Sequence, residues 1–132
     1  MTTDYEPWLK EPLEHLFESH GFVCFARRRT VMDTWCGYIY LPSTHPDFGR
    51  DYDDVEVHVH GGLTYADPEG DVDVWCFGFD CAHYMDLRPS SKVYYDEMDT
   101  DPFAGATWKS LDFVINELDL LAQQFQHRGE SK

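Results

Sequence analysis

The stretch from Val55 to Tyr65 reads V-E-V-H-V-H-G-G-L-T-Y, and the interpretation of the whole chain starts from it. Its first six residues alternate valine with glutamate or histidine. This alternation is typical of a strand with one buried face, because successive side chains point to opposite sides of a strand. Gly61 and Gly62 indicate a tight turn, and a second short apolar run follows them. We therefore expect a strand, a reversal and a further strand, with His58 and His60 close to the turn.

A second unusual run, W-C-F-G-F-D-C-A-H, extends from Trp75 to His83. Val72 to Phe79 is apolar on both alternate faces from Val74 onward, which predicts a central strand, and Gly78 within it indicates a bulge or a close approach of another backbone. The strand ends on residues that can do chemistry. If it ends beside the Gly61–Gly62 turn, the two segments form the best candidate site in the sequence.

The other segments predict two terminal helices around a group of strands. Apolar residues recur at three and four from Glu6 to His20, which predicts a helix that stops at Gly21. Phe22 to Arg29 and Trp35 to Leu41 predict an antiparallel hairpin, and the unperiodic stretch Pro42 to Asp54 predicts a long loop.

Beyond the candidate site, Ala66 to Asp71 predicts a turn and Val93 to Tyr95 a short edge strand. The acidic run Asp96 to Asp101 predicts a solvated loop or a flap over the site. Trp108 to Gln126 has a clear helical stripe, with Thr107 as its N-cap. The sum is a single α+β domain over 1–132, a mainly antiparallel sheet of about four to six strands covered by N-terminal and C-terminal helices.

The composition limits the classes of function. With 42% hydrophobic and 16% aromatic residues, the 132-residue chain can bury a core of its own. It carries 25 acidic and 10 basic residues, a formal net charge of -15, which repels phosphates and disfavours direct binding of nucleic acid. The same field attracts basic surfaces, so an acidic mimic of nucleic acid is one candidate. The simpler explanation is that the charge maintains solubility.

The four cysteines lack metal-binding or redox spacing. The acidic N-terminus has no features of a secretion signal, and no segment has the length of a membrane span. We therefore expect reduced thiols and a cytoplasmic protein that does not enter a membrane.

Metal binding is the first chemical hypothesis. His58 and His60 would lie about 7 Å apart on one strand face. Together with Cys81 and His83 they offer nitrogen and sulfur ligands of the type that tetrahedral zinc prefers. No familiar zinc spacing is present, and a solvated strand face that happens to carry two histidines explains the first pair equally well.

Catalysis and ligand binding are the other two hypotheses. Asp80, Cys81, His83 and Asp86 could form a Cys-His or His-Asp arrangement, but no nucleophile elbow or phosphate-binding glycine loop accompanies them. A ligand pocket would combine an apolar wall with a few polar groups. The wall would come from Tyr65, Trp75, Phe77 and Tyr84, and the polar groups from His60, Asp80 and His83. These side chains could equally be core and strand-end hydrogen bonds.

Three blocks of the sequence are distinctive: H-G-G-L-T-Y at His60–Tyr65, G-F-D-C-A-H at Gly78–His83 and L-D-F-V-I-N-E-L-D-L-L-A at Leu111–Ala122. They resemble a family of small uncharacterised proteins found in phage genomes and bacterial mobile regions. The similarity covers most of the chain from Gly37 onward. It implies a phage-type accessory protein in the host cytoplasm, with a role in counter-defence or host takeover.

The resemblance also narrows the candidate site, because His58 lies outside its blocks. The expected ligand-binding residues are His60, Gly61, Gly62, Thr64, Asp80, Cys81, His83 and Asp86. We favour a non-enzymatic protein that binds a host protein or a small molecule. The alternatives are a small metal-dependent hydrolase that uses His60, Asp80 and His83, with zinc as the candidate metal, and an acidic mimic that blocks a basic groove of a host protein.

Overall fold

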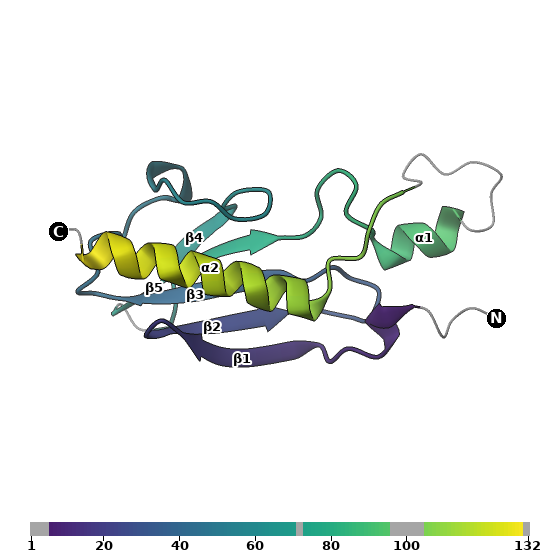
Figure 1. Ribbon diagram of the computed structural model, residues 1–132, viewed down its shortest axis with the longest axis horizontal. Coiled ribbons are helices and arrows are strands. Elements are labelled where there is room, and N and C mark those ends of the chain that lie inside the picture. Colours follow the sequence, from purple (N-terminus) through teal and green to yellow (C-terminus); the bar gives the residue numbers. More distant parts are fainter. Residues whose placement is uncertain (1–5, 71–72, 96–104, 131–132) are drawn as a thin grey trace.

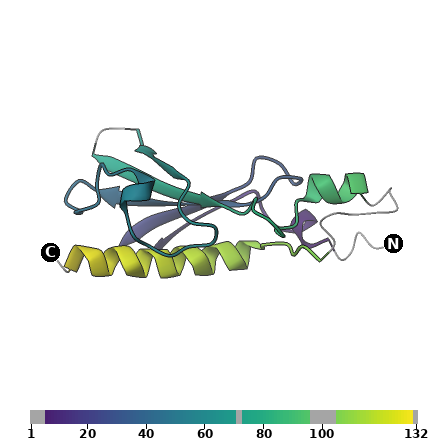
Figure 2. The same ribbon diagram turned by 90° about the horizontal axis from the view of Figure 1, so that it is seen from above.

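The computed structural model describes residues 6–70, 73–95 and 105–130. It contains a five-stranded antiparallel sheet in the order β1-β2-β3-β5-β4, with one long helix, α2, along one face (Figures 1 and 2). The predicted α+β class is confirmed. The elements are η2 (Pro7–Leu9), β1 (Glu14–Ser19), β2 (Phe22–Arg27), β3 (Cys36–Pro42), η3 (Tyr52–Asp54), β4 (Tyr65–Pro68), β5 (Val74–Asp80), α1 (Pro89–Tyr95) and α2 (Leu111–Glu130).

The predicted N-terminal helix is wrong. Only the turn η2 is helical, and the segment that follows forms the edge strand β1, which pairs with β2. Pro12 cannot donate the backbone hydrogen bond that a helix interior requires. Gly21 has φ +87° and His20 has φ +51°, the two positive values that a tight hairpin turn needs. The glycine that suggested a helix end therefore closes a hairpin.

The N-terminal segment is fixed by a buried arginine. Arg28, which is 2% exposed, donates from Nη2 to the carbonyl oxygens of Trp8, Glu11 and Pro12 at 2.8, 3.1 and 3.2 Å. Its guanidinium carbon lies 5.0 Å from the ring centroid of Trp35, a cation-π contact. The segment before β1 is thus attached to the sheet by Arg28 and also by its own Glu11, whose Oε1 accepts from Trp35 Nε1 at 3.0 Å, which explains how it stays ordered without a helix.

The hairpin of β2 and β3 and the central strand β5 are confirmed. β5 pairs with β3 on one side and β4 on the other. Gly78 permits a close approach, as predicted: an added Cβ would lie 2.8 Å from the Tyr38 ring and 3.2 Å from the Gly37 carbonyl oxygen. The strand predicted after the Gly61–Gly62 turn is β4, but it continues through residues 66–68, where the sequence predicted a turn, because these residues pair with β5.

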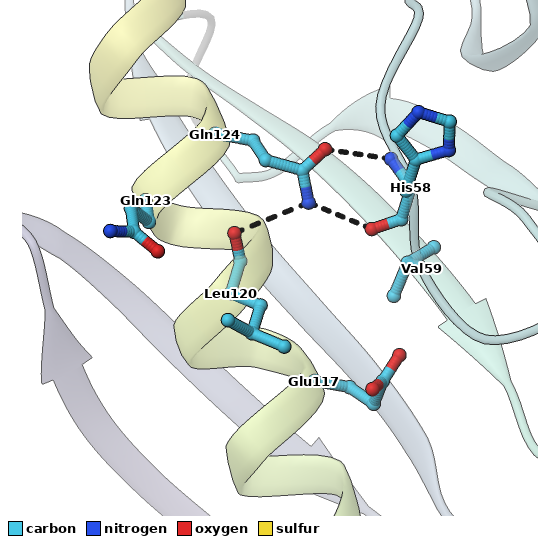
Figure 3. A pocket seen from close by; sticks show the side chains of 6 residues that line it. All are labelled: His58, Val59, Glu117, Leu120, Gln123 and Gln124. Atoms are coloured by element: carbon cyan, nitrogen blue, oxygen red, sulfur yellow. Dashed lines mark hydrogen bonds between the residues drawn. The ribbon is translucent and has the colours of Figure 1, made fainter.

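The stretch 55–60 is extended but has no strand partner, so the predicted strand is wrong. It runs beside α2 and buries Val55, with Val57 and Val59 packed on the core. Its backbone is bonded by helix side chains instead of a neighbouring strand. The Gln124 carboxamide accepts from the His58 N–H at 2.7 Å and donates to the His58 carbonyl at 2.8 Å (Figure 3). Glu117 Oε1 accepts from the His60 N–H at 2.8 Å.

The core lies between the sheet and a second layer made of α2 and this extended stretch. α2 packs against β1, β2 and β3. It begins at Leu111, after Ser110, whose hydroxyl accepts from the Phe113 N–H at 3.2 Å, so Ser110 and not Thr107 is the N-cap. The fully buried side chains of this core include Cys24, Trp35, Ile39, Leu41, Phe77, Phe79, Val114, Leu118, Leu121 and Phe125.

Two further predictions concern the segment between β5 and α2. Residues 93–95, predicted as an edge strand, belong to helix α1, which starts at Pro89, a residue suited to the first helical position. The acidic run Asp96–Asp101, predicted as a loop or flap, lies outside the described residues.

Candidate functional site

The two segments singled out from the sequence meet at one end of the sheet. The Thr64 N–H donates to the Gly78 carbonyl at 2.9 Å, which continues the pairing of β4 with β5 by one residue. The Thr64 hydroxyl donates to Asp80 Oδ2 at 3.1 Å. The turn before β4 is therefore held against the loop that follows β5.

Asp86 is the centre of the polar contacts. Its side chain is 2% exposed, and its oxygens lie 2.8 and 3.0 Å from His60 Nε2. The His83 N–H donates to Oδ2 at 3.1 Å, and Lys109 Nζ lies 3.1 Å from Oδ1. Burial opposes ionisation, but the donors from His60, His83 and Lys109 outweigh it and hold the pKa of Asp86 below its ordinary value. Asp86 is therefore a buried carboxylate that joins three segments.

His83 lies directly against Gly61. An added Cβ at Gly61, where φ is +70°, would be 2.1 Å from His83 Nε2. The same nitrogen is 3.2 Å from Asp80 Oδ1, although the contact lacks the alignment of a hydrogen bond. The rings of His60 and His83 are 5.7 Å apart between centroids and meet edge to face. Two neighbouring histidine-carboxylate pairs result, packed on a glycine backbone.

Six of the eight predicted site residues come together in this way: His60, Gly61, Thr64, Asp80, His83 and Asp86. The other two do not. Gly62 has φ +81° with no heavy atom within 4 Å of an added Cβ, so it faces open space. Cys81 is 1% exposed and points into the core, where burial raises the pKa of its thiol far above the ordinary value.

The predicted metal site does not have a metal-binding arrangement. Across the described ranges, no three His, Cys, Asp or Glu side chains form a group that could hold a metal ion. His60 and His83 each face a different carboxylate, and Cys81 is in the core. His58 lies beside Gln124 and is not part of the cluster. The residues present therefore do not fit a zinc ion bound by His60, Asp80 and His83.

Three residues of the site were not predicted, and all lie in or just before α2. Lys109 contacts Asp86, Glu117 bonds the His60 backbone, and the Phe113 ring meets the His60 ring edge to face with centroids 5.1 Å apart. Two sequence signals concern Phe113 and Glu117: both lie in the block Leu111–Ala122, and they flank the apolar stripe of α2 at a spacing of four, which places them on one side of the helix.

The loop 81–88 is shaped by these contacts and exposes one large side chain. Tyr84 is 82% exposed, and the next residue, Met85, has φ +67°, which is strained for a residue with a side chain. Within the loop, Arg88 donates to the Ala82 carbonyl at 2.5 Å, and the Asp86 N–H donates to the His83 carbonyl at 2.9 Å. The loop is therefore held in a fixed shape that presents Tyr84 to solvent.

A shallow hollow of about 500 Å³ lies between α2 and the extended stretch 55–60 (Figure 3). It is lined by His58, Val59, Glu117, Leu120, Gln123 and Gln124. None of the eight predicted ligand-binding residues is among those that line it.

In the parts of the chain that the structure describes, no helix has both the length and the apolar character that crossing a membrane requires. Comparison with known proteins finds no matching family model, no matching curated protein and no matching solved structure.

Proposed function

We propose that the protein is a phage-type accessory protein that binds a host component in the host cytoplasm without catalysing a reaction. The observation that carries this proposal is the fixed loop 81–88, which holds Tyr84 82% exposed beside the His60–Asp86 contact. Tyrosine is enriched at the centres of protein interfaces because it offers a large contact area and a hydroxyl at low entropic cost. A host protein is therefore a better fit than a small molecule.

The chemistry of the cluster supports binding over catalysis. The nearest thiol, that of Cys81, is buried, and its raised pKa keeps it protonated. Among the described residues, the contacts of the His60 and His83 rings are to carboxylates, to other rings and, for His83, to Gly61, and neither ring bonds a hydroxyl or a thiol. A nucleophile activated by a histidine would need such a bond. The two histidines instead position the loop.

The test is co-purification from a bacterial host. Tagged wild-type protein is expected to retain a host protein that mass spectrometry identifies, and Tyr84→Ser is expected to lose it. Tyr52→Ser is the matched control, because Tyr52 is exposed (40%) in a different turn, η3. Inhibition of the captured host protein is then tested by measuring the activity of that protein with and without the accessory protein. Equal capture by wild type and Tyr84→Ser would contradict the proposal.

One observation favours the acidic mimic as a second candidate. Residues 51–56 include four exposed carboxylates, Asp51, Asp53, Asp54 and Glu56, on one short stretch of a chain with net charge -15. A mimic would bind a basic groove through such charges. Its partner should dissociate between about 0.1 and 0.5 M salt, because exposed charges are screened over shorter distances as salt rises. It should also be retained by Tyr84→Ser.

A further inference from the structure

The sheet face opposite α2 carries a continuous apolar row. Strand register aligns Leu16, Phe25, Tyr38, Gly78 and Tyr65 across all five strands, one residue from each. Side chains one position away along each strand point to the α2 side, since they alternate across a strand. With strands about 4.8 Å apart, the row is roughly 19 Å long. We call this surface, with the two rows beside it, the open face.

The open face keeps much of its apolar surface exposed. Leu16 is 66% exposed, Tyr65 is 39% exposed and Val23, in the next row, is 39% exposed, whereas Cys24, Ala26, Ile39 and Leu41 on the α2 side are buried. The Tyr38 ring lies over Gly78 and meets the Tyr65 ring edge to face, with centroids 5.7 Å apart. Because Gly78 has no side chain, the two rings settle onto the sheet. Together they form an aromatic surface at this edge of the sheet.

Carboxylate side chains lie at the ends of the two rows that flank the apolar row. One flanking row runs Glu18, Val23, Tyr40, Cys76, Asp67, and the other runs Glu14, Arg27, Cys36, Asp80. Four acidic side chains therefore surround the apolar row. Arg27 is the one cation in these rows. The arrangement combines an apolar centre with a charged rim, as in protein interfaces.

The charges decide what kind of partner fits. A second copy of the chain would bring another net charge of -15 against the same carboxylates, and a nucleic acid would bring phosphates, so both are repelled. A basic segment is attracted by the rim. We infer that the open face docks a basic protein segment in which lysine or arginine alternates with large apolar residues. Its apolar side chains cover the row from Leu16 to Tyr65, and its cations meet the rim carboxylates.

The probe is a capped ten-residue peptide of alternating lysine and leucine, with two control peptides in which glutamate replaces lysine or serine replaces leucine. Binding is followed by amide NMR shifts of the protein. We expect shifts on β1 to β5 with the lysine-leucine peptide alone. Shifts of equal size with the lysine-serine peptide, or none with any peptide at millimolar concentration, would overturn the inference. A dimer that forms through the open face without peptide would overturn it in favour of a second copy.

Matched variants separate the open face from general charge attraction. Tyr65→Ser is expected to weaken peptide binding about tenfold, and Tyr52→Ser, with the same exposed fraction, less than twofold. Leu16→Ser and Leu120→Ser form a second pair, in which both leucines are exposed, at 66% and 45%, and Leu120 lies on α2 away from the open face. Equal weakening within the pairs would overturn the inference. Tyr84→Ser should leave peptide binding unchanged, so this test is independent of the proposed function.

A third pair, of two triple variants with equal net charge, tests the rim carboxylates. Neutralising Glu14, Glu18 and Asp67 as Gln, Gln and Asn should weaken binding of the lysine-leucine peptide more than fivefold. Neutralising Asp53, Asp54 and Glu56 in the same way removes three charges away from the open face and should change binding less than twofold. All six residues are exposed, so both triple variants are expected to fold, which circular dichroism can verify. Equal weakening by the two triples would show that only net charge matters and overturn the inference.

Discussion

The side chain of Gln124 bonds both backbone groups of His58: its Oε1 accepts from the N–H at 2.7 Å and its Nε2 donates to the carbonyl at 2.8 Å. A neighbouring strand would offer the same donor and acceptor pair. The helix thus takes the place of a sixth strand for the stretch 55–60. This arrangement fixes the position of His60, two residues further on, and with it the site.

Replacing Gln124 by alanine is expected to lower the free energy of unfolding by about 1 kcal/mol. The two hydrogen bonds to His58 and a third to the Leu120 carbonyl are lost, but water can reach the exposed backbone of His58 and replace them in part. Urea denaturation measures the change, and hydrogen exchange should show the His58 amide exchanging faster in the variant than in wild type.

Gln123→Ala is the control, because Gln123 is the exposed neighbour on the same helix. It should change stability by less than about 0.5 kcal/mol. If the two variants had equal effects, the carboxamide of Gln124 would not be what holds the extended stretch.

The contact between Gln124 and His58 shows which part of the stretch 55–60 was predictable from the sequence and which part was not. Alternation from Val55 to His60 correctly predicted an extended backbone with valines inward. Alternation reports burial on one side and says nothing about the source of backbone hydrogen bonds. Those come from Gln124 and Glu117, more than fifty residues away, and a polar position on a helix face has no signature for such a role.

The helix predicted for the N-terminal segment is wrong for a related reason. In the stretch from Leu13 to Phe17, apolar residues at three and four fit a helix, but the segment pairs with β2 as a strand. Local periodicity is ambiguous over so few residues, and tertiary pairing decides. Within the site, the blocks around His60 and His83 were predictable because β4 and β5 are close in sequence. Lys109 was not, since its contact with Asp86 depends on how the chain enters α2.

Gly61 and Gly62 should respond differently to alanine. Both have positive φ, so each substitution strains the backbone by about 1–2 kcal/mol. Only at Gly61 would the new methyl group also collide with the His83 ring, 2.1 Å away. Gly61→Ala should therefore cost more stability than Gly62→Ala and shift the ring NMR signals of His83.

Chemical denaturation of both variants gives the first quantity, and histidine ring spectra give the second. Gly62→Ala serves as the control for backbone strain, because nothing lies within 4 Å of its added Cβ. Unchanged His83 signals in Gly61→Ala would mean that the turn and the histidine are not in contact in solution.

Arg28 and Arg29 are adjacent but should differ sharply when replaced by lysine. Arg28 is 2% exposed and bonds the carbonyls of Trp8, Glu11, Pro12 and Val31. A lysine ammonium cannot reach all of them, and buried carbonyls left unpaired cost about 1–3 kcal/mol each. We expect Arg28→Lys to lose roughly 2–4 kcal/mol in urea denaturation.

Arg29→Lys is the matched control. The Arg29 side chain is 82% exposed and its contact with Asp33 is a surface ion pair at 3.5 Å, so the expected loss is below about 0.5 kcal/mol. A small loss in Arg28→Lys would show that the N-terminal segment does not depend on the guanidinium.

Asp47 should make stability depend on pH in the acid range. Its carboxylate is 1% exposed and accepts from Arg128 Nε at 2.6 Å and Nη2 at 2.9 Å, and from Arg50 at 3.2 Å. The Arg128 hydrogen bonds lower the pKa of Asp47 against the opposing effect of burial. Since the ordinary value near 3.9 applies to the unfolded chain, the unfolded state takes up the proton first as the pH falls. The stabilisation is complete above about pH 5 and is lost below about pH 4.

The many other carboxylates also titrate in this range, and their repulsion falls as they are protonated, so wild type must be compared with Asp47→Asn. At pH 7 the variant should be about 2 kcal/mol less stable, because charged hydrogen bonds to Arg128 are lost. The difference in free energy of unfolding should shrink as the pH falls from 5 to 3, since the wild-type carboxylate becomes neutral too. Asp53→Asn, at an exposed carboxylate, should follow wild type throughout. If the difference in free energy of unfolding between wild type and Asp47→Asn stayed constant to pH 3, it would contradict the lowered pKa of Asp47. If it shrinks, part of the acid sensitivity of the protein comes from the Arg128–Asp47 contact, which joins α2 to the loop before η3.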